Sequence, residues 1–160
     1  MRTFPAVLLA LALAAVAGCS AARNAEPPIS TLKGKDVVLI LWHDSHFNYT
    51  LMEKVTDHVT RKGYKTINDE DYRADLYRAS DYAAVVFLVK HEAKGSMKIA
   101  DAFIKKHGGR GNIVASISHE WDVDGSTIKK SYDAFTAASK DFEQEEILKS
   151  ITNRLDGMLK

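Results

Sequence analysis

The chain has 160 residues, of which 46% are hydrophobic, and this length suits one compact domain with its own core, not two. Its 22 basic and 21 acidic residues nearly cancel. The sequence therefore gives no sign of the basic surface that binds nucleic acid or an anionic membrane. Because Cys19 is the only cysteine, an internal disulfide is excluded.

Residues 1–18 have the pattern of a secretory signal. Arg2 supplies an early positive charge, and an apolar run then extends from Phe4 to Ala17. This run is shorter than the roughly 20 apolar residues that a membrane-spanning helix needs. The segment therefore predicts export of the rest of the chain.

The signal ends in Val16-Ala17-Gly18-Cys19, which resembles the lipobox of bacterial lipoproteins. The resemblance implies that residues 1–18 are removed and that Cys19 carries acyl chains that anchor the protein to a membrane. With Ser20 instead of an aspartate after the cysteine, it also implies the periplasmic face of the outer membrane of a Gram-negative cell. The alternative is a small buried cysteine that merely follows a secretory run.

Residues 19–35 are small and polar and contain Pro27-Pro28, which is typical of a flexible tether. We expect the folded domain to cover residues 36–160. In chain order, the pattern of this domain predicts strand 36–42, a helix ending at Gly63, strand 64–68, strand 82–89, a helix closed by Gly108-Gly109, strand 112–118, short strand 132–138 and a helix opening at Asp141.

The three helices are predicted from apolar residues that recur at helical spacing. Asp141 and Gln144 form a capping-box pattern at the start of the last helix. The apolar positions are Leu51, Val55 and Val59 in the first helix, Met97, Ala100 and Ile104 in the second, and Ile147, Ile151, Leu155 and Met158 in the third.

Strands alternate with helices, and the central strands are apolar along their whole length. This pattern indicates a parallel sheet that is covered by helices on both faces. Five strands on this scale predict an α/β, doubly wound fold of the flavodoxin-like type with strand order 2-1-3-4-5. In such sheets, ligands bind beyond the carboxyl ends of the strands, where the strand order reverses.

Histidines and carboxylates follow the three central strands, in the segments "WHDSH", "VKHEAKGS" and "SHEWDVDG". Imidazole with carboxylate is the ligand set of zinc, copper, nickel or non-haem iron, so the pattern predicts a divalent transition-metal site. The predicted ligands are His43, His46, His91 and His119, with Asp44, Glu92, Glu120, Asp122 and Asp124 as neighbouring acids. The alternative is that these polar residues only cap exposed loops.

The segment from about Asp36 to Trp121 resembles the NADPH-dependent FMN reductases and quinone reductases, a branch of the flavodoxin-like superfamily. The most specific stretch is "ASDYAAVVFLVKHEAKGSM", and "FNYTL" in the first loop matches more weakly. The matching positions in the longer stretch are Asp81, Glu92, Gly95 and Ser96.

The resemblance implies that the domain binds FMN. Ser45, Asn48 and Thr50 would serve the flavin phosphate at a helix N-terminus. The 91–96 loop, with Glu92, Gly95 and Ser96, and the 119–124 loop, which starts at His119, would hold the isoalloxazine ring. Because an exported protein does not meet cytosolic NADPH, the expected role is electron transfer with an envelope redox partner.

Three functions remain open from the sequence. The first is a flavin-binding redox lipoprotein, with oxidoreductase activity as one form of it. The second is a metal-binding envelope protein. The third is a non-catalytic domain that kept the fold and acts in assembly or partner binding.

Overall fold

The structure is a computed structural model that describes residues 30–109, 111–119, 133–135 and 141–159. The chain divides into two compact units, Met1–Ser30 and Thr31–Lys160, and the second contains the folded domain. The predicted signal and Cys19 lie outside the described residues. Within the described ranges, no helix is long and apolar enough to cross a bilayer.

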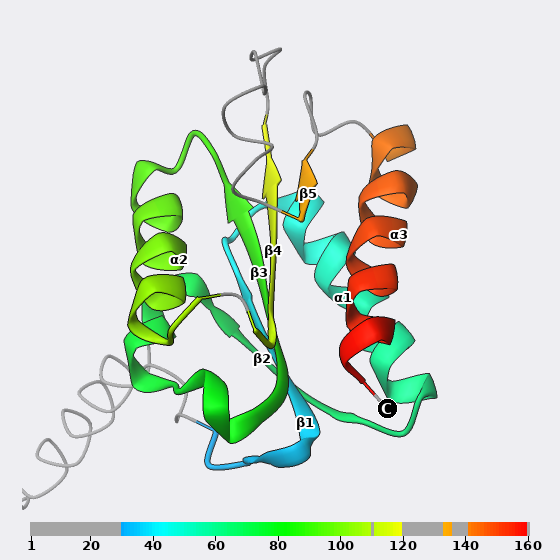
Figure 1. Cartoon of the computed structure of the whole chain (residues 1–160). Coiled ribbons are helices and arrows are strands. Elements are labelled where there is room, and N and C mark those ends of the chain that lie inside the picture. The colour runs from blue at the N-terminus through cyan, green and yellow to red at the C-terminus, as the bar shows by residue number, and fades with distance from the viewer. Residues whose placement is uncertain (1–29, 110, 120–132, 136–140, 160) are drawn as a thin grey trace, which may run out of the picture. The chain divides into compact units, whose positions relative to one another are not determined.

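A parallel sheet with strand order β2-β1-β3-β4-β5 forms the centre of the domain (Figure 1). This order and direction confirm the predicted flavodoxin-like, doubly wound α/β fold. The strands are β1 (Gly34–Trp42), β2 (Lys65–Glu70), β3 (Tyr82–Lys90), β4 (Ile113–Ser118) and β5 (Ala134–Phe135).

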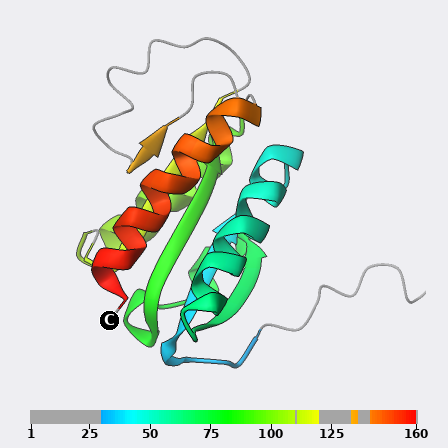
Figure 2. The same ribbon diagram turned by 90° about the vertical axis from the view of Figure 1, so that its right-hand side faces the viewer.

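Helices cover both faces of the sheet. Helix α2 lies on one face, while α1 and α3 lie side by side on the other (Figures 1 and 2). The helices are α1 (His46–Arg61), α2 (Lys94–Lys106) and α3 (Asp141–Met158), with the 3-10 helices η1 (Asp71–Leu76) and η2 (Ala79–Asp81) between β2 and β3.

The core has two halves, one on each face of the sheet. Alternate residues of β1 point to opposite faces, so Leu39 packs in the half that contains Phe103 of α2. Ile40 packs in the half that contains Leu51 of α1 and Leu155 of α3. This double burial explains why the central strands are apolar throughout.

Helix α1 is capped at both ends. Ser45 is the N-cap, and its hydroxyl accepts a hydrogen bond from the backbone N–H of Asn48. At the other end, Gly63 follows the C-cap Lys62 with a φ of +89°. Since this backbone region is unfavourable for residues with a Cβ, the structure confirms Gly63 as the C′ glycine.

The boundaries of several elements differ from prediction. Strand β1 begins at Gly34, two residues inside the predicted tether, because Gly34 already pairs with Tyr82 of β3. The Lys35 ammonium donates hydrogen bonds to the carbonyls of Ser80 and Tyr82 beside it. The acidic stretch after β2, for which no element was predicted, folds into η1 and η2. Of the predicted strand 132–138, the described residues 133–135 contain the two residues of β5.

Strand β2 is an edge strand of the sheet, as the predicted strand order 2-1-3-4-5 requires. It is also the most polar of the longer strands. Lys65, Asn68 and Glu70 are exposed, and Ile67 is its one fully buried apolar residue.

Candidate functional site

The carboxyl ends of β1, β3 and β4 lie next to one another. The backbone N–H of His43, just after β1, donates to the carbonyl of Leu88 in β3 at 2.9 Å. The N–H of His91, just after β3, donates to the carbonyl of Ser118 at the end of β4, also at 2.9 Å. His119 follows directly, so histidines from three strand ends share one edge of the sheet.

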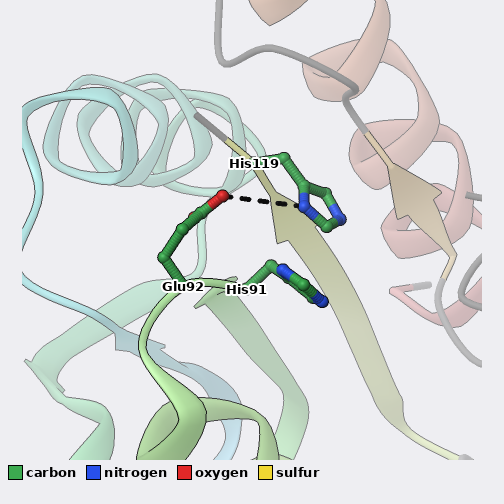
Figure 3. Close-up of side chains that lie close together, drawn as sticks. All are labelled: His91, Glu92 and His119. Atoms are coloured by element: carbon green, nitrogen blue, oxygen red, sulfur yellow. Dashed lines mark ion pairs between the residues drawn. The ribbon is translucent and has the colours of Figure 1, made fainter. Parts of the chain in front are cut away.

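His91, Glu92 and His119 form a compact cluster at this edge, which we call the histidine–glutamate cluster (Figure 3). One ligand atom from each residue lies within 4.8 Å of the others. The ring centroids of the two histidines are 4.0 Å apart, and His119 Nδ1 lies 3.7 Å from Glu92 Oε1. His119 is fully buried, whereas His91 and Glu92 are half-buried and reachable from solvent.

The electrostatic environment keeps His119 neutral. Burial lowers the pKa of His119 below its usual range, and the neighbouring His91 lowers it further. Glu92 opposes these effects without reversing them. Neutral imidazole is the form that ligates metals, so the buried histidine is ready to bind without first losing a proton.

The prediction that four strand-end histidines converge is wrong for two of them. His43 turns toward η1, where its Nδ1 lies 3.4 Å from Asp71 Oδ2. His46 is the exposed first residue of α1. Within the described part of the chain, neither belongs to the metal-ligating group that contains His91 and His119.

The side chains predicted to serve a flavin phosphate mostly bond within the protein. Asn48 is 1% exposed, and its amide donates to the carbonyls of His43 and Leu88. Thr50 Oγ1 donates back to the carbonyl of His46 in its own helix. Only Ser45 keeps its hydroxyl at the helix N-terminus, where it accepts the N–H of Asn48 at 3.3 Å.

The loop residues Gly95 and Ser96 lie in the first turn of α2. Gly95 is exposed, and a Cβ at this position would meet no atom within 4 Å. Ser96 is 3% exposed, and its hydroxyl donates a hydrogen bond to the carboxylate of Asp71. Ser96 is therefore a buried residue that helps to hold this edge of the sheet together, and its hydroxyl is already engaged by Asp71.

Asp71 is a site residue that sequence reasoning missed. It opens η1, is 4% exposed, and contacts both His43 and Ser96. No sequence signal marks it beyond its place shortly after the predicted strand 64–68; in the structure it directly follows β2. Glu120, Trp121, Asp122 and Asp124, which the sequence also placed near the site, lie outside the described residues.

No protein-family model and no curated protein matches this sequence. Three solved structures are similar in fold, each at 10% sequence identity. A flavodoxin from the domain Archaea has a TM-score of 0.50, with 76% of this chain and 98% of the flavodoxin covered. This likeness shows the flavodoxin-like fold alone.

The other two structures superpose less well. Rubredoxin oxygen:oxidoreductase from Desulfovibrio gigas has a TM-score of 0.47, and the match covers 79% of this chain but 37% of the oxidoreductase. Hypothetical protein MJ1247 from Methanococcus jannaschii, for which a 3-hexulose-6-phosphate isomerase function is inferred, has a TM-score of 0.42. That match covers 77% of this chain and 68% of the other.

The fold family implies FMN, and the N-terminus of α1 tests that implication. Asn48 and Thr50 are engaged elsewhere, so they do not fit as phosphate ligands. A flavin phosphate would instead depend on Ser45 and on backbone N–H groups of the first turn, which contains no acidic residue. The histidine–glutamate cluster, in contrast, brings one ligand atom from each of three side chains within 4.8 Å of the others.

Proposed function

We propose that this chain is an exported, lipid-anchored envelope protein that binds a divalent transition-metal ion at His91, Glu92 and His119. The observation that carries the proposal is the convergence of two imidazoles and one carboxylate within 4.8 Å, from two neighbouring strand ends. This edge of the sheet is also where doubly wound folds bind ligands.

The chemistry of the cluster suits zinc, copper, nickel or iron(II). Imidazole nitrogen and carboxylate oxygen bind such ions at about 2.0–2.2 Å. In a tetrahedral site two ligand atoms of one ion are about 3.3–3.6 Å apart, so the half-buried side chains must draw inward by roughly 1 Å to close the site. The described residues supply three ligands, and a site with three protein ligands keeps a coordination position open, which is typical of sites that bind an exogenous ligand rather than of structural sites.

Elemental analysis of the full chain tests the proposal. The protein is extracted in detergent without a His tag or chelator, dialysed against Zn²⁺ and then against metal-free buffer. We expect about one ion per chain, and its loss in His91→Ala and in His119→Ala. His58→Ala is the matched control, because His58 pairs with Asp156 between α1 and α3, away from the cluster. Equal zinc content in all four proteins would refute the site.

The anchor rests on the lipobox resemblance at Cys19. Labelling cells that express the full chain with radioactive palmitate tests it directly. We expect a labelled band that disappears in Cys19→Ala, and labelled protein that fractionates with the outer membrane. Label that persists in the variant would contradict attachment at Cys19.

A second candidate function is FMN-dependent electron transfer with an envelope redox partner. The observation that favours it is the flavodoxin-like fold shared with the archaeal flavodoxin. FMN would supply one- and two-electron transfer, and the first turn of α1 would hold its phosphate. An absorbance spectrum of the same preparation decides between the candidates. Flavin bands near one equivalent would favour this role, whereas colourless protein that does not bind added FMN would exclude it.

Protein that binds neither metal nor flavin would support the third function, partner binding in envelope assembly. A stable, stoichiometric partner in a pull-down with the full chain would then be expected. Failure to recover one would count against that role.

A further inference from the structure

Asp71 joins three segments that meet at the edge of the sheet. It is the first residue of η1, directly after β2, and its side chain is 5% exposed. Its Oδ2 accepts a hydrogen bond from the hydroxyl of Ser96 in α2 and lies 3.4 Å from Nδ1 of His43, just after β1. A buried carboxylate is retained only where such partners compensate for its lost hydration.

The neighbouring carboxylate of Asp69 shows what an ordinary structural role looks like in this segment. Asp69 accepts hydrogen bonds from Arg73 and Tyr77, which ties the end of β2 to the 3-10 turn that follows. Those partners come from its own stretch of chain. Asp71 instead reaches across to two other loops, one of which leads into the histidine–glutamate cluster.

The loop that carries His91 and Glu92 is held at both ends. At its start, the N–H of His91 bonds to the carbonyl of Ser118, the residue before His119. At its end, the N–H of Ser96 bonds to the carbonyl of Ala93, and the hydroxyl of Ser96 bonds to Asp71. Without the second tie, the first turn of α2 would lose its buried anchor.

We propose that Asp71 is a positioning residue for the metal site, acting through Ser96. It fixes the first turn of α2, and so keeps the loop from His91 to Ala93 in the form that brings His91 and Glu92 to His119. The proposal rests on the proposed metal-binding function. Asp71 is not itself among the clustered ligand atoms, so its effect on the metal is indirect.

Two variants distinguish a positioning role of Asp71 from a purely electrostatic effect of its charge on the metal. Ser96→Ala removes the hydroxyl that Asp71 holds but leaves the carboxylate charge in place. Asp71→Asn removes the charge while keeping the shape and an oxygen acceptor. If Asp71 acted only as a nearby negative charge, Asp71→Asn alone would weaken metal binding. If it positions the loop through Ser96, Ser96→Ala weakens binding, and Asp71→Asn, which keeps an acceptor for Ser96, weakens it less.

The measurement is the affinity of the full chain in detergent for Zn²⁺, by competition with a chromophoric chelator. A Co²⁺ absorption spectrum reports the ligand geometry. We expect Ser96→Ala to bind zinc about 10–100-fold more weakly, with weakened or shifted Co²⁺ bands, and Asp71→Asn to lose less affinity than Ser96→Ala. The matched control is Asp69→Asn, which removes a half-buried charge from the same segment. Its affinity and Co²⁺ spectrum are expected to remain those of the unmodified protein.

The outcomes separate the two proposals. Unmodified protein that binds no Zn²⁺ overturns the proposed function, and this inference with it. Binding that His119→Ala abolishes but Ser96→Ala leaves unchanged overturns the role of Asp71 alone. An equal loss in Asp69→Asn and Ser96→Ala would mean that any destabilisation of this region weakens the site, which also overturns it. Each protein is compared below its own thermal transition, monitored by circular dichroism.

Discussion

The imidazole rings of His91 and His119 face one another with centroids 4.0 Å apart and planes inclined by 35°. Burial lowers the pKa of His119, and the neighbouring His91, which would repel a second positive charge, lowers it further. A metal ion held by the two neutral rings and the Glu92 carboxylate would add three favourable bonds to the folded state.

Metal binding should therefore stabilise the folded domain. At a free Zn²⁺ concentration 100 times the dissociation constant, we expect the free energy of unfolding to rise by about 2.7 kcal/mol. Thermal unfolding of the full chain with Zn²⁺ and with a chelator measures this. His119→Ala should show no difference between the two conditions. A zinc-dependent shift of equal size in that variant would place the bound metal elsewhere.

The buried amide of Asn48 is expected to contribute to stability more than to ligand binding. It donates to the carbonyls of His43 and Leu88, and its Oδ1 accepts the hydroxyl of Ser118 at 3.3 Å. Asn48→Ala should lower the free energy of unfolding by about 1–3 kcal/mol, measured by urea denaturation. The exposed Asn68, which bonds to Thr56, is the control, and Asn68→Ala should change stability by less than about 0.5 kcal/mol.

Two glycines should respond to alanine in opposite directions. Gly63 has a φ of +89°, so Gly63→Ala should destabilise the domain by about 1 kcal/mol. Gly157 is exposed in α3, and a Cβ there would meet no atom within 4 Å. Gly157→Ala should stabilise it by up to about 1 kcal/mol. Urea denaturation of both variants checks the pair, and shifts in the same direction would contradict the prediction.

His107 should make the domain less stable in mild acid. Its half-buried ring packs on Phe103, and burial, followed by the charges of Lys106 and Arg78, lowers its pKa. The unfolded chain then takes up a proton near pH 6.5, before the folded protein does. Stability is therefore complete above about pH 6.5 and falls as the pH drops below it, until the folded pKa is reached.

The test compares urea denaturation of the metal-free protein at pH 7 and pH 5. His107→Gln should show a smaller loss of stability between these values than the unmodified protein. Some loss should remain, because the pKa of His119 is lowered in the same sense. If His107→Gln lost as much stability between pH 7 and pH 5 as the unmodified protein, the His107 ring would titrate alike in the folded and unfolded states.

The fold was predictable because burial on both faces leaves a simple mark in the sequence. Strand β3 is apolar along nearly its whole length, and Leu51, Val55 and Val59 repeat at helical spacing. The 3-10 helix that contains Asp71 has neither mark, since its form depends on contacts with α2, β1 and β3, which lie elsewhere along the chain. That is why this segment carried no predicted element.

The site was predictable only in part, for a geometric reason. Parallel strands bring their carboxyl ends together, so His91 and His119 were expected to meet, and they do. Sequence position does not say which way a side chain turns after the strand ends. His43 turned toward Asp71, and His46 became the first residue of a helix. Asp71 itself was missed because no pattern marks a carboxylate whose partners lie in other loops.

The polar edge strand β2 has a consequence for how copies of this protein behave when crowded. An open strand edge offers backbone N–H and carbonyl groups to any neighbouring strand, and charged side chains discourage such pairing. In β2, Lys65 and Glu70 are exposed at its two ends, with Asn68 between them. On the proposed membrane surface, where anchored copies would collide often, this edge would resist sheet extension from one molecule to the next and keep the domains separate.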